Sequence, residues 1–234
     1  SLRELLGLSD AELKKLALRA PAVLGYSFEQ NVKPSLQSLR ELLGLSDAEL
    51  KKVVLGLVLG LPAVLCLSIE ENVKPSLQSL RELLGLSDAE LKKVVVGLSP
   101  VLGLSFEDNL EPKLNFLRVE LELDAAELRG LVLREPSILG RGLDISLRPN
   151  VILLREELSR EGMQLRSEVL RRGLSVLKYS FCKRVQPRVD RARTVGVAAS
   201  VVLRKVAYTD AEFDRWLARQ CTAMHGERPT RQKK

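Results

Sequence analysis

Arginine and lysine are concentrated between Arg155 and Lys205, where 13 basic residues stand against five acidic ones. Like charges at this density repel one another unless a polyanion such as a nucleic acid screens them. A charge run can also be an ordinary solvated surface. The residues that we expect to contact phosphate are Arg134, Arg141, Arg148, Arg171, Arg172, Lys178, Lys183, Arg184, Arg188, Arg191, Arg193, Arg204 and Lys205.

Residue patterns typical of catalysis or metal binding are missing from the sequence. His225 is the only histidine and stands in a polar tail, and there is no P-loop, GxGxxG, GxSxG or HExxH motif. Three cysteines stand far apart without a CxxC pair, so neither a zinc site nor a disulfide framework is expected. We therefore predict a protein that is not an enzyme and has no cofactor; a hydrolase acting on nucleic acid would need an acidic cluster to hold its metal.

The basic charge is unevenly shared along the chain. Residues 1–110 hold 12 Lys and Arg against 14 Asp and Glu, whereas residues 111–234 hold 25 against 16, within a total net charge of +7. The first part is also the part that repeats verbatim. We infer that the duplicated repeats are scaffold and that the divergent repeats carry the ligand contacts.

The elements that must position these charges come from an internal repeat. The phrase SLRELLGLSDAELKK begins at Ser1, Ser38 and Ser79, with spacings of 37 and 41 residues. Beyond residue 103 the sequence of the repeat diverges but the proline spacing persists, which is typical of a repeat array. The repeats divide near Pro34, Pro75, Pro112, Pro149 and Pro187.

Each repeat predicts two helices. Leucines recur at helical spacing between Pro34 and Gly44, and the glycine suits a left-handed C-terminal cap. A capping box, Ser46 with Glu49, then begins the second helix. The same box is expected at Ser9–Glu12, Ser87–Glu90, Asp124–Glu127 and Thr209–Glu212. A 3₁₀ turn or tight bend should link the second helix to the next repeat.

Stacked repeats of this kind predict an all-α solenoid, or superhelix, of about five to six helix-helix-3₁₀ repeats of 37–41 residues. Repeat two has four extra residues, read as one more turn of its second helix. The longest apolar run, Val53 to Val64, is too short to span a bilayer. We expect one solenoid over residues 1–220, with capping helices at 190–220 and a basic, disordered tail at 221–234. The protein should be a monomer without a membrane partner.

Two repeated slots deserve separate interpretations. An aromatic or isoleucine slot is expected to lie in the core, at Phe28, Ile69, Phe106, Ile145 and Phe181. Tyr179 is also expected to pack in the core, although it could reach a base. A first proline, Pro21, Pro62 or Pro136, stands 13 residues before the dividing, second proline in three of the repeats. The slot two residues before this first proline varies, and either a ligand or the helix macrodipole explains its arginines. It holds Arg19, Gly60, Gly97, Arg134 and Arg172.

With the pattern proline, twelve residues, proline, and with lines such as LVLREPSIL and SFEDNLEPKLNFL, the chain resembles the mitochondrial transcription termination factor (mTERF) family. The resemblance implies a superhelix whose concave, basic face binds double-stranded DNA or structured RNA in mitochondria or chloroplasts. Transcription termination or regulation, RNA maturation and ribosome assembly are the roles it implies. The sequence starts at Ser1 within a repeat, so we expect further residues upstream, including any targeting peptide.

A protein-interaction scaffold is the alternative interpretation. In this interpretation the nearly neutral repeats one to three hold a protein partner, for example an RNA-modifying enzyme, and the basic end anchors the complex. The two interpretations differ in whether changes in the basic set or in the duplicated helices abolish function.

Overall fold

The computed structural model describes residues 3–4, 7–19, 30, 32–60 and 69–225. Within these ranges the chain is built from helices and short helical turns, with no β-strand. It divides into two compact units, an N-terminal unit, Ser1–Leu143, and a C-terminal unit, Asp144–Lys234. The prediction of an all-α helical-repeat solenoid is confirmed.

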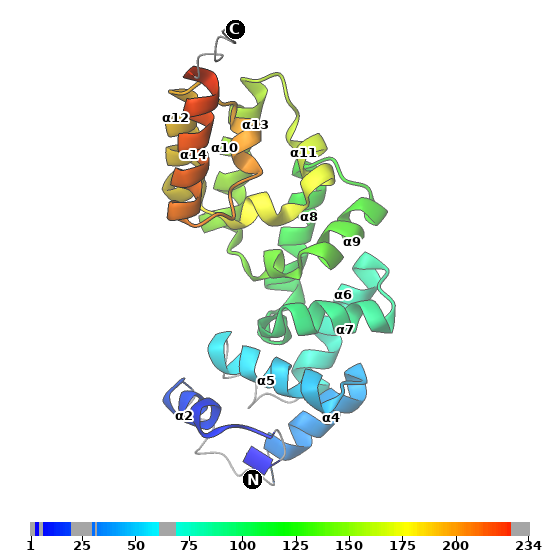
Figure 1. Ribbon diagram of the computed structural model, residues 1–234. Helices are drawn as coiled ribbons and strands as arrows, with labels where there is room; N and C mark the ends of the chain where they lie inside the picture. Colours follow the sequence, from blue (N-terminus) through cyan, green and yellow to red (C-terminus); the bar gives the residue numbers. More distant parts are fainter. Residues whose placement is uncertain (1–2, 5–6, 20–29, 31, 61–68, 226–234) are drawn as a thin grey trace, which may run out of the picture. The chain divides into compact units, whose positions relative to one another are not determined.

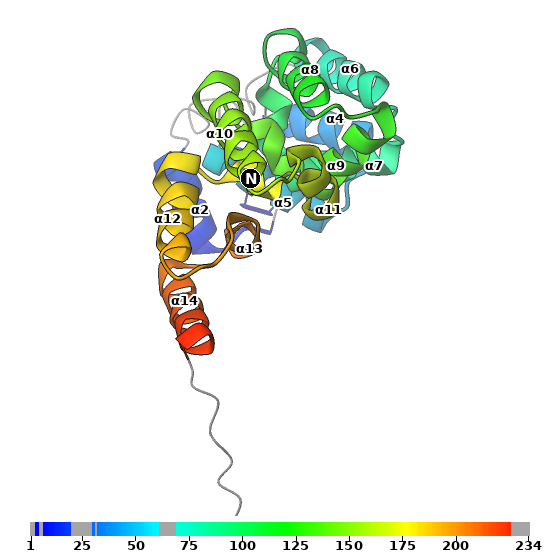
Figure 2. The same cartoon turned by 90° about the horizontal axis from the view of Figure 1, so that it is seen from above.

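In the N-terminal unit, the described long helices alternate between first and second helices of the repeats (Figure 1). Figure 2 shows α4, α6 and α8 on one side of this unit and α5, α7 and α9 on the other. The first helices are α4 (Lys33–Leu43), α6 (Lys74–Leu84) and α8 (Glu111–Glu120), and the second helices are α2 (Asp10–Arg19), α5 (Asp47–Gly60), α7 (Asp88–Gly97) and α9 (Ala125–Arg134).

Local sequence fixes where these helices begin and end. Gly44 and Gly85 adopt φ angles of 57° and 60° after α4 and α6, the left-handed conformation that glycine takes without a Cβ penalty. All five predicted capping boxes form, with the hydroxyl or carboxylate accepting from the third backbone N–H and the glutamate accepting in return. The extra residues of repeat two lengthen α5 to 14 residues, against 10 in α7, as predicted.

The link between repeats is more elaborate than the predicted 3₁₀ turn. The 3₁₀ helices η4 (Ser99–Gly103), η6 (Pro136–Gly140) and η8 (Leu174–Lys178) are present. Each is followed by a wider π turn, η5 (Phe106–Leu110), η7 (Leu143–Leu147) or η9 (Phe181–Val185), and η3 (Ile69–Val73) is a fourth. A proline stands two residues after each π turn, and its ring would collide with the carbonyl four residues before it in a regular α-helix. The wider turn accommodates the ring.

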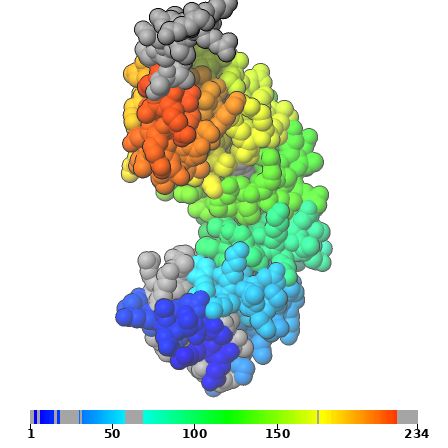
Figure 3. Space-filling model, in the orientation of Figure 1, coloured from blue at the N-terminus to red at the C-terminus, as the bar shows by residue number. Residues whose placement is uncertain are grey.

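Leucine and valine form the core, as their spacing predicts. In the first helices, Leu36, Leu39 and Leu43 are buried, and Leu77, Leu80 and Leu84 repeat the pattern. In Figure 3 the atoms of residues 33–60 lie against those of residues 74–97, because neighbouring repeats cover one another's apolar faces. Burying one such side chain is worth about 1.5–3 kcal/mol.

The C-terminal unit contains α10 (Arg148–Ser159), α11 (Leu165–Arg172), α12 (Gln186–Arg193), α13 (Ala199–Leu203) and α14 (Asp210–His225). Phe213 and Trp216 are buried on α14, with ring centroids 5.3 Å apart. Helix α14 continues through Cys221 to His225, so the part of the predicted tail before residue 226 is helical. Residues 226–234 lie outside the described residues.

One core prediction is wrong. Ile69, Phe106 and Phe181 are buried, whereas Ile145 is 89% exposed. Counted back from Pro149, the equivalent position is Leu143, which opens the π turn η7 as Phe106 opens η5. Phe28 lies outside the described residues.

Among the helices that the structure describes, none combines the length and the apolar character that a membrane-spanning segment needs.

Candidate nucleic-acid interface

A ladder of ion pairs connects successive second helices of the N-terminal unit. Lys51 Nζ lies 3.0 Å from the Glu12 carboxylate and donates a hydrogen bond to the Gly7 carbonyl at 2.8 Å. Lys92 repeats both contacts one repeat later, with Glu49 at 2.7 Å and the Gly44 carbonyl at 2.8 Å. In the next repeat, Arg129 lies 2.6 Å from Glu90. A basic residue at the same position of the second helix therefore holds the preceding repeat each time.

The capping glutamates thus have two sets of partners. For Glu12 and Glu90 the backbone N–H of the capping serine is the main cause that lowers the pKa to about 2, followed by the lysine or arginine of the next repeat. For Glu49 the hydrogen bond from Lys92 is the main cause, followed by Ser46, and the pKa is again about 2. These carboxylates stay ionised over the whole neutral and mildly acidic range.

The neighbouring lysines, Lys52 and Lys93, are exposed, and their side chains have no partner among the described residues. Both line a cavity of about 400 Å³ that also touches Arg134 at the end of α9. Sequence analysis missed these two lysines because the duplicated repeats are acidic overall. The signal was the repeated Lys-Lys pair, in which one residue makes the ladder and the other faces outward.

The slot before the first proline is not uniformly open to a ligand. A Cβ built on Gly97 would lie 3.0 Å from Cγ of Pro136, so in this repeat the next repeat fills the position. Arg134 is exposed and has an interaction partner. The side chain of Arg19 lies outside the described residues. The ligand and macrodipole interpretations of the arginines in this slot both remain predictions.

The residue after the second proline connects neighbouring segments through buried hydrogen bonds. Lys113 donates to the Leu139 carbonyl at 2.8 Å, and burial lowers its pKa. Asn150 donates to the carbonyls of Leu177 and Tyr179 at 2.9 Å each. In the last repeat the same position is Arg188. All three side chains are at most 5% exposed.

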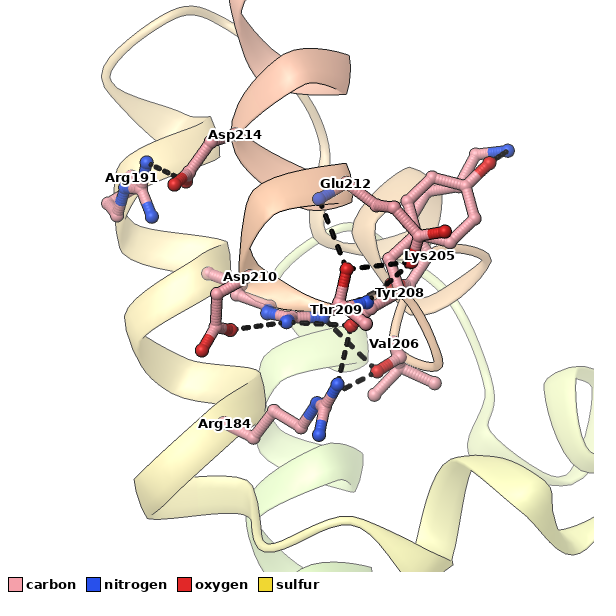
Figure 4. Close-up of polar contacts among 10 residues, drawn as sticks. Arg184, Arg191, Lys205, Val206, Tyr208, Thr209, Asp210, Glu212 and Asp214 are labelled. Atoms are coloured by element: carbon pink, nitrogen blue, oxygen red, sulfur yellow. Dashed lines mark hydrogen bonds and ion pairs between the residues drawn. The ribbon is translucent and has the colours of Figure 1, made fainter.

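Arg188 is therefore misplaced among the predicted phosphate contacts. Its guanidinium donates to the carbonyls of Val206 at 3.2 Å and Tyr208 at 2.8 Å and to the Asp210 carboxylate at 2.6 Å. Figure 4 shows the same carbonyl groups approached by Arg184, which donates to Val206 at 3.0 Å and also to Tyr208. A phosphate could reach Arg188 only by breaking these bonds.

Most other predicted arginines have acidic partners. Arg171 and Arg172 pair with Glu168, and Arg193 pairs with the buried Glu157. The pairs Arg148–Asp144, at 3.1 Å, and Arg191–Asp214, at 2.6 Å, are exposed. An exposed pair of this kind is worth little, typically about 0.2–1 kcal/mol, so phosphate can still compete for its arginine.

The remaining predicted residues differ in whether their side chains already have a bonding partner. Lys178 has a partner, and Lys205 donates to the Tyr208 hydroxyl at 3.1 Å. Arg141, Lys183 and Arg204 are exposed and have no side-chain partner in the part of the chain that the structure describes. These three are the best placed of the predicted set for a ligand in solution.

Aromatic residues add little to this surface. Tyr179 is half-buried, and the guanidinium of Arg184 lies 4.8 Å above its ring. Phe213 is covered in the same way by Arg188, at 4.8 Å. Over the described ranges, no group of three or more His, Cys, Asp or Glu could hold a metal ion. The arrangement is suited to electrostatic binding of an anionic polymer.

The family model for mTERF matches residues 1–171, which include the N-terminal unit and the first helices of the C-terminal unit. No curated protein matches the chain.

Proposed function

Since the chain belongs to the mTERF family, we propose that it binds nucleic acid without catalysing a reaction, in mitochondria or chloroplasts. Membership of the family suggests an organellar nucleic-acid-binding helical-repeat protein. The finer proposal is that the chain binds double-stranded DNA or structured RNA as a monomer, in transcription termination or regulation, RNA maturation or ribosome assembly.

One observation carries this proposal. Exposed basic side chains without an acidic partner among the described residues occur in both units, as Lys52 and Lys93 in the first and Lys183 and Arg204 in the second. Lys51 and Lys92, which precede Lys52 and Lys93 in the sequence, make the contacts that hold the repeats together. Lysine and arginine that are left unpaired on a repeat scaffold can bind phosphate and release counterions.

Such contacts determine affinity and register more than sequence preference. Phosphate oxygens carry no sequence information, so discrimination between bases would need a side chain that reaches the base edges. We therefore propose a binding mode in which the solenoid follows the shape and backbone of its target.

Fluorescence anisotropy tests the proposal. Labelled duplex DNA, structured RNA and single-stranded RNA are titrated with the chain over ~50–200 mM salt. A variant with Lys52, Lys93, Lys183 and Arg204 changed to alanine should bind more weakly, with a flatter dependence on salt. The control variant changes Arg215 and Arg219 to alanine; both are exposed on α14 and donate to the backbone of their own helix.

Weak binding whose affinity depends neither on the salt concentration nor on the four alanine substitutions would contradict the proposal. The scaffold function would then be favoured, and one specific feature supports it. A cavity of about 540 Å³ between α5 and the α7–η4 segment is lined largely by apolar side chains, among them Leu55, Val96, Leu98 and Pro100. A short apolar segment of a protein partner would fit such a groove.

A further inference from the structure

A third cavity, of about 470 Å³, lies within the C-terminal unit where the end of α11 and the turn η8 face the end of α13. Arg171, Arg172 and Arg204 line it, together with Ser175 and Tyr179. No acidic residue lines it. We call it the arginine cavity; it combines three guanidinium groups with two hydroxyl groups.

The positive charge around the arginine cavity is only partly compensated. Glu168 is buried, with its side chain 3% exposed, and it pairs with both Arg171 and Arg172. Arg204 is exposed and has no acidic partner among the described residues. Three positive charges therefore share one carboxylate.

Arg172 is the most constrained of the three arginines. Its side chain is 13% exposed, its Nε lies against the Glu168 carboxylate, and its Nη1 and Nη2 have no hydrogen-bond partner among the described residues. Burial lowers the pKa of Arg172, and the charges of Arg171 and Arg204 lower it further, while Glu168 raises it. Buried donors without acceptors are rare in folded proteins and call for a ligand or a structural explanation.

We propose that the arginine cavity binds a phosphate monoester, held by Arg171, Arg172 and Arg204. A phosphate monoester has three terminal oxygens that accept hydrogen bonds from arginine in pairs, and Arg172 lines the cavity with two terminal nitrogens that lack a partner among the described residues. Ser175 and Tyr179 offer hydroxyl groups at the same wall. The volume is sufficient for a nucleotide as well as for its phosphate.

Charge favours a monoester over the diester of a continuous backbone. Three arginines and one glutamate leave a surplus of two positive charges around the cavity, and a phosphate monoester carries about −1.5 to −2 at neutral pH. A backbone diester or a protein carboxylate carries only one negative charge. In naming the phosphorylated end of a nucleic acid as the source of this group, the inference rests on the proposed function; a free mononucleotide carries the same group.

Paired ligands that differ only in the phosphate provide the test. A short RNA with a 5′-phosphate is compared with the same RNA bearing a 5′-hydroxyl, and adenosine monophosphate with adenosine, by anisotropy and calorimetry on the full chain. One charge-assisted hydrogen bond to the phosphate corresponds to a preference of about tenfold. The variant R204Q should abolish this preference, R171Q should reduce it, and R215Q, outside the cavity, should leave it unchanged.

The outcomes separate this inference from the proposed function. If the 5′-phosphorylated and 5′-hydroxyl RNAs bind equally and adenosine monophosphate does not bind, the inference is overturned, while salt-dependent binding of RNA would still support the proposed function. If adenosine monophosphate binds in an Arg204-dependent way and no nucleic acid binds, the cavity is a nucleotide site and the proposed function fails. A preference that R204Q leaves intact also overturns the inference.

Discussion

The N-terminal and C-terminal units differ in which repeat positions make their prominent polar contacts. In the N-terminal unit the charged contacts between second helices are half-buried, and lysine or arginine pairs with a capping glutamate. In the C-terminal unit the prominent contacts are buried, and Asn150 and Arg188 donate to backbone carbonyls. The position that they occupy is Ser35 or Ser76 in the duplicated repeats.

This difference explains why part of the sequence can repeat verbatim. A residue that pairs with an identical neighbour in every repeat needs no change when the repeat is duplicated. Arg188, by contrast, donates to Val206, Tyr208 and Asp210, in the segment that leads into α14. This segment occurs once in the chain, so the residue that contacts it differs from its counterparts in other repeats. Divergence in the C-terminal unit therefore has structural causes as well as the functional ones that charge density suggests.

The largest effect is expected from removing a buried contact of the C-terminal unit. Arg188→Met removes the guanidinium that lies over the Phe213 ring and donates to Asp210, and it leaves Arg184 as the remaining arginine donor to the carbonyls of Val206 and Tyr208. Unfolding free energy should fall by about 2–4 kcal/mol, measured by urea denaturation. Arg191→Met, which breaks an exposed pair, is the control and should cost less than about 1 kcal/mol. Equal losses would contradict the distinction between the two arginines.

Asn150 offers a smaller effect of the same kind. Asn150→Ala removes two donated bonds, to Leu177 and Tyr179, and the bond that its Oδ1 accepts from the Phe181 N–H at 3.0 Å. The expected loss is about 2 kcal/mol, measured as a lower melting temperature by circular dichroism. Asn115→Ala on α8, a half-exposed position without a hydrogen bond among the described residues, should change it little. An unchanged melting temperature in Asn150→Ala would rule out a stabilising role for this contact.

The adjacent lysines of the duplicated repeats separate binding from stacking. Changing Lys52 and Lys93 to alanine should weaken nucleic-acid binding about tenfold and flatten the salt slope by about two, because two phosphate contacts are lost. Changing Lys51 and Lys92 should lower the urea midpoint and leave the slope unchanged, since those lysines face carbonyls and glutamates. If changing Lys51 and Lys92 alters the salt slope as much as changing Lys52 and Lys93, the assignment of binding to one pair and stacking to the other is wrong.

The smallest effect is expected from pH. Folding lowers the pKa of Glu12, Glu49 and Glu90 from 4.5 to about 2, so their contribution to stability is fully present above pH 4.5 and is lost as the pH falls toward 2. Melting temperatures measured between neutral and acidic pH should fall across this window. The fall should be smaller in Glu49→Gln with Glu90→Gln, which removes two of the titrating groups. An identical pH profile in that variant would show that other carboxylates determine the acid sensitivity.

Much of the fold could be predicted because its signals are local. The capping boxes, the left-handed glycines and the longer α5 depend on residues within a few positions of one another. The π turns could not be predicted, since they depend on how the proline ring meets a carbonyl across a turn. The misassignment of Ile145 shows the limit of slot alignment, because a two-residue error in the alignment assigned an exposed residue to the core.

The candidate site was less predictable than the fold. Density of charge singled out the region of Arg171, Arg172 and Arg204, but it also included Arg188, and it omitted Lys52 and Lys93. The sequence gives the position of each charged residue along the chain but not the group with which it pairs. Whether an arginine faces solvent, a carboxylate or a carbonyl depends on residues that are distant along the chain.

The sequence by itself determined the helical repeat, its period and the ends of most helices, because backbone hydrogen bonds and helix caps are made between near neighbours. Only the tertiary structure decided which basic side chains remain available. Arg188 is consumed by three carbonyl groups and a carboxylate, whereas Arg204 stays exposed beside a cavity. Two arginines of identical chemistry differ in their availability to a ligand because packing provides acceptors to one and not to the other.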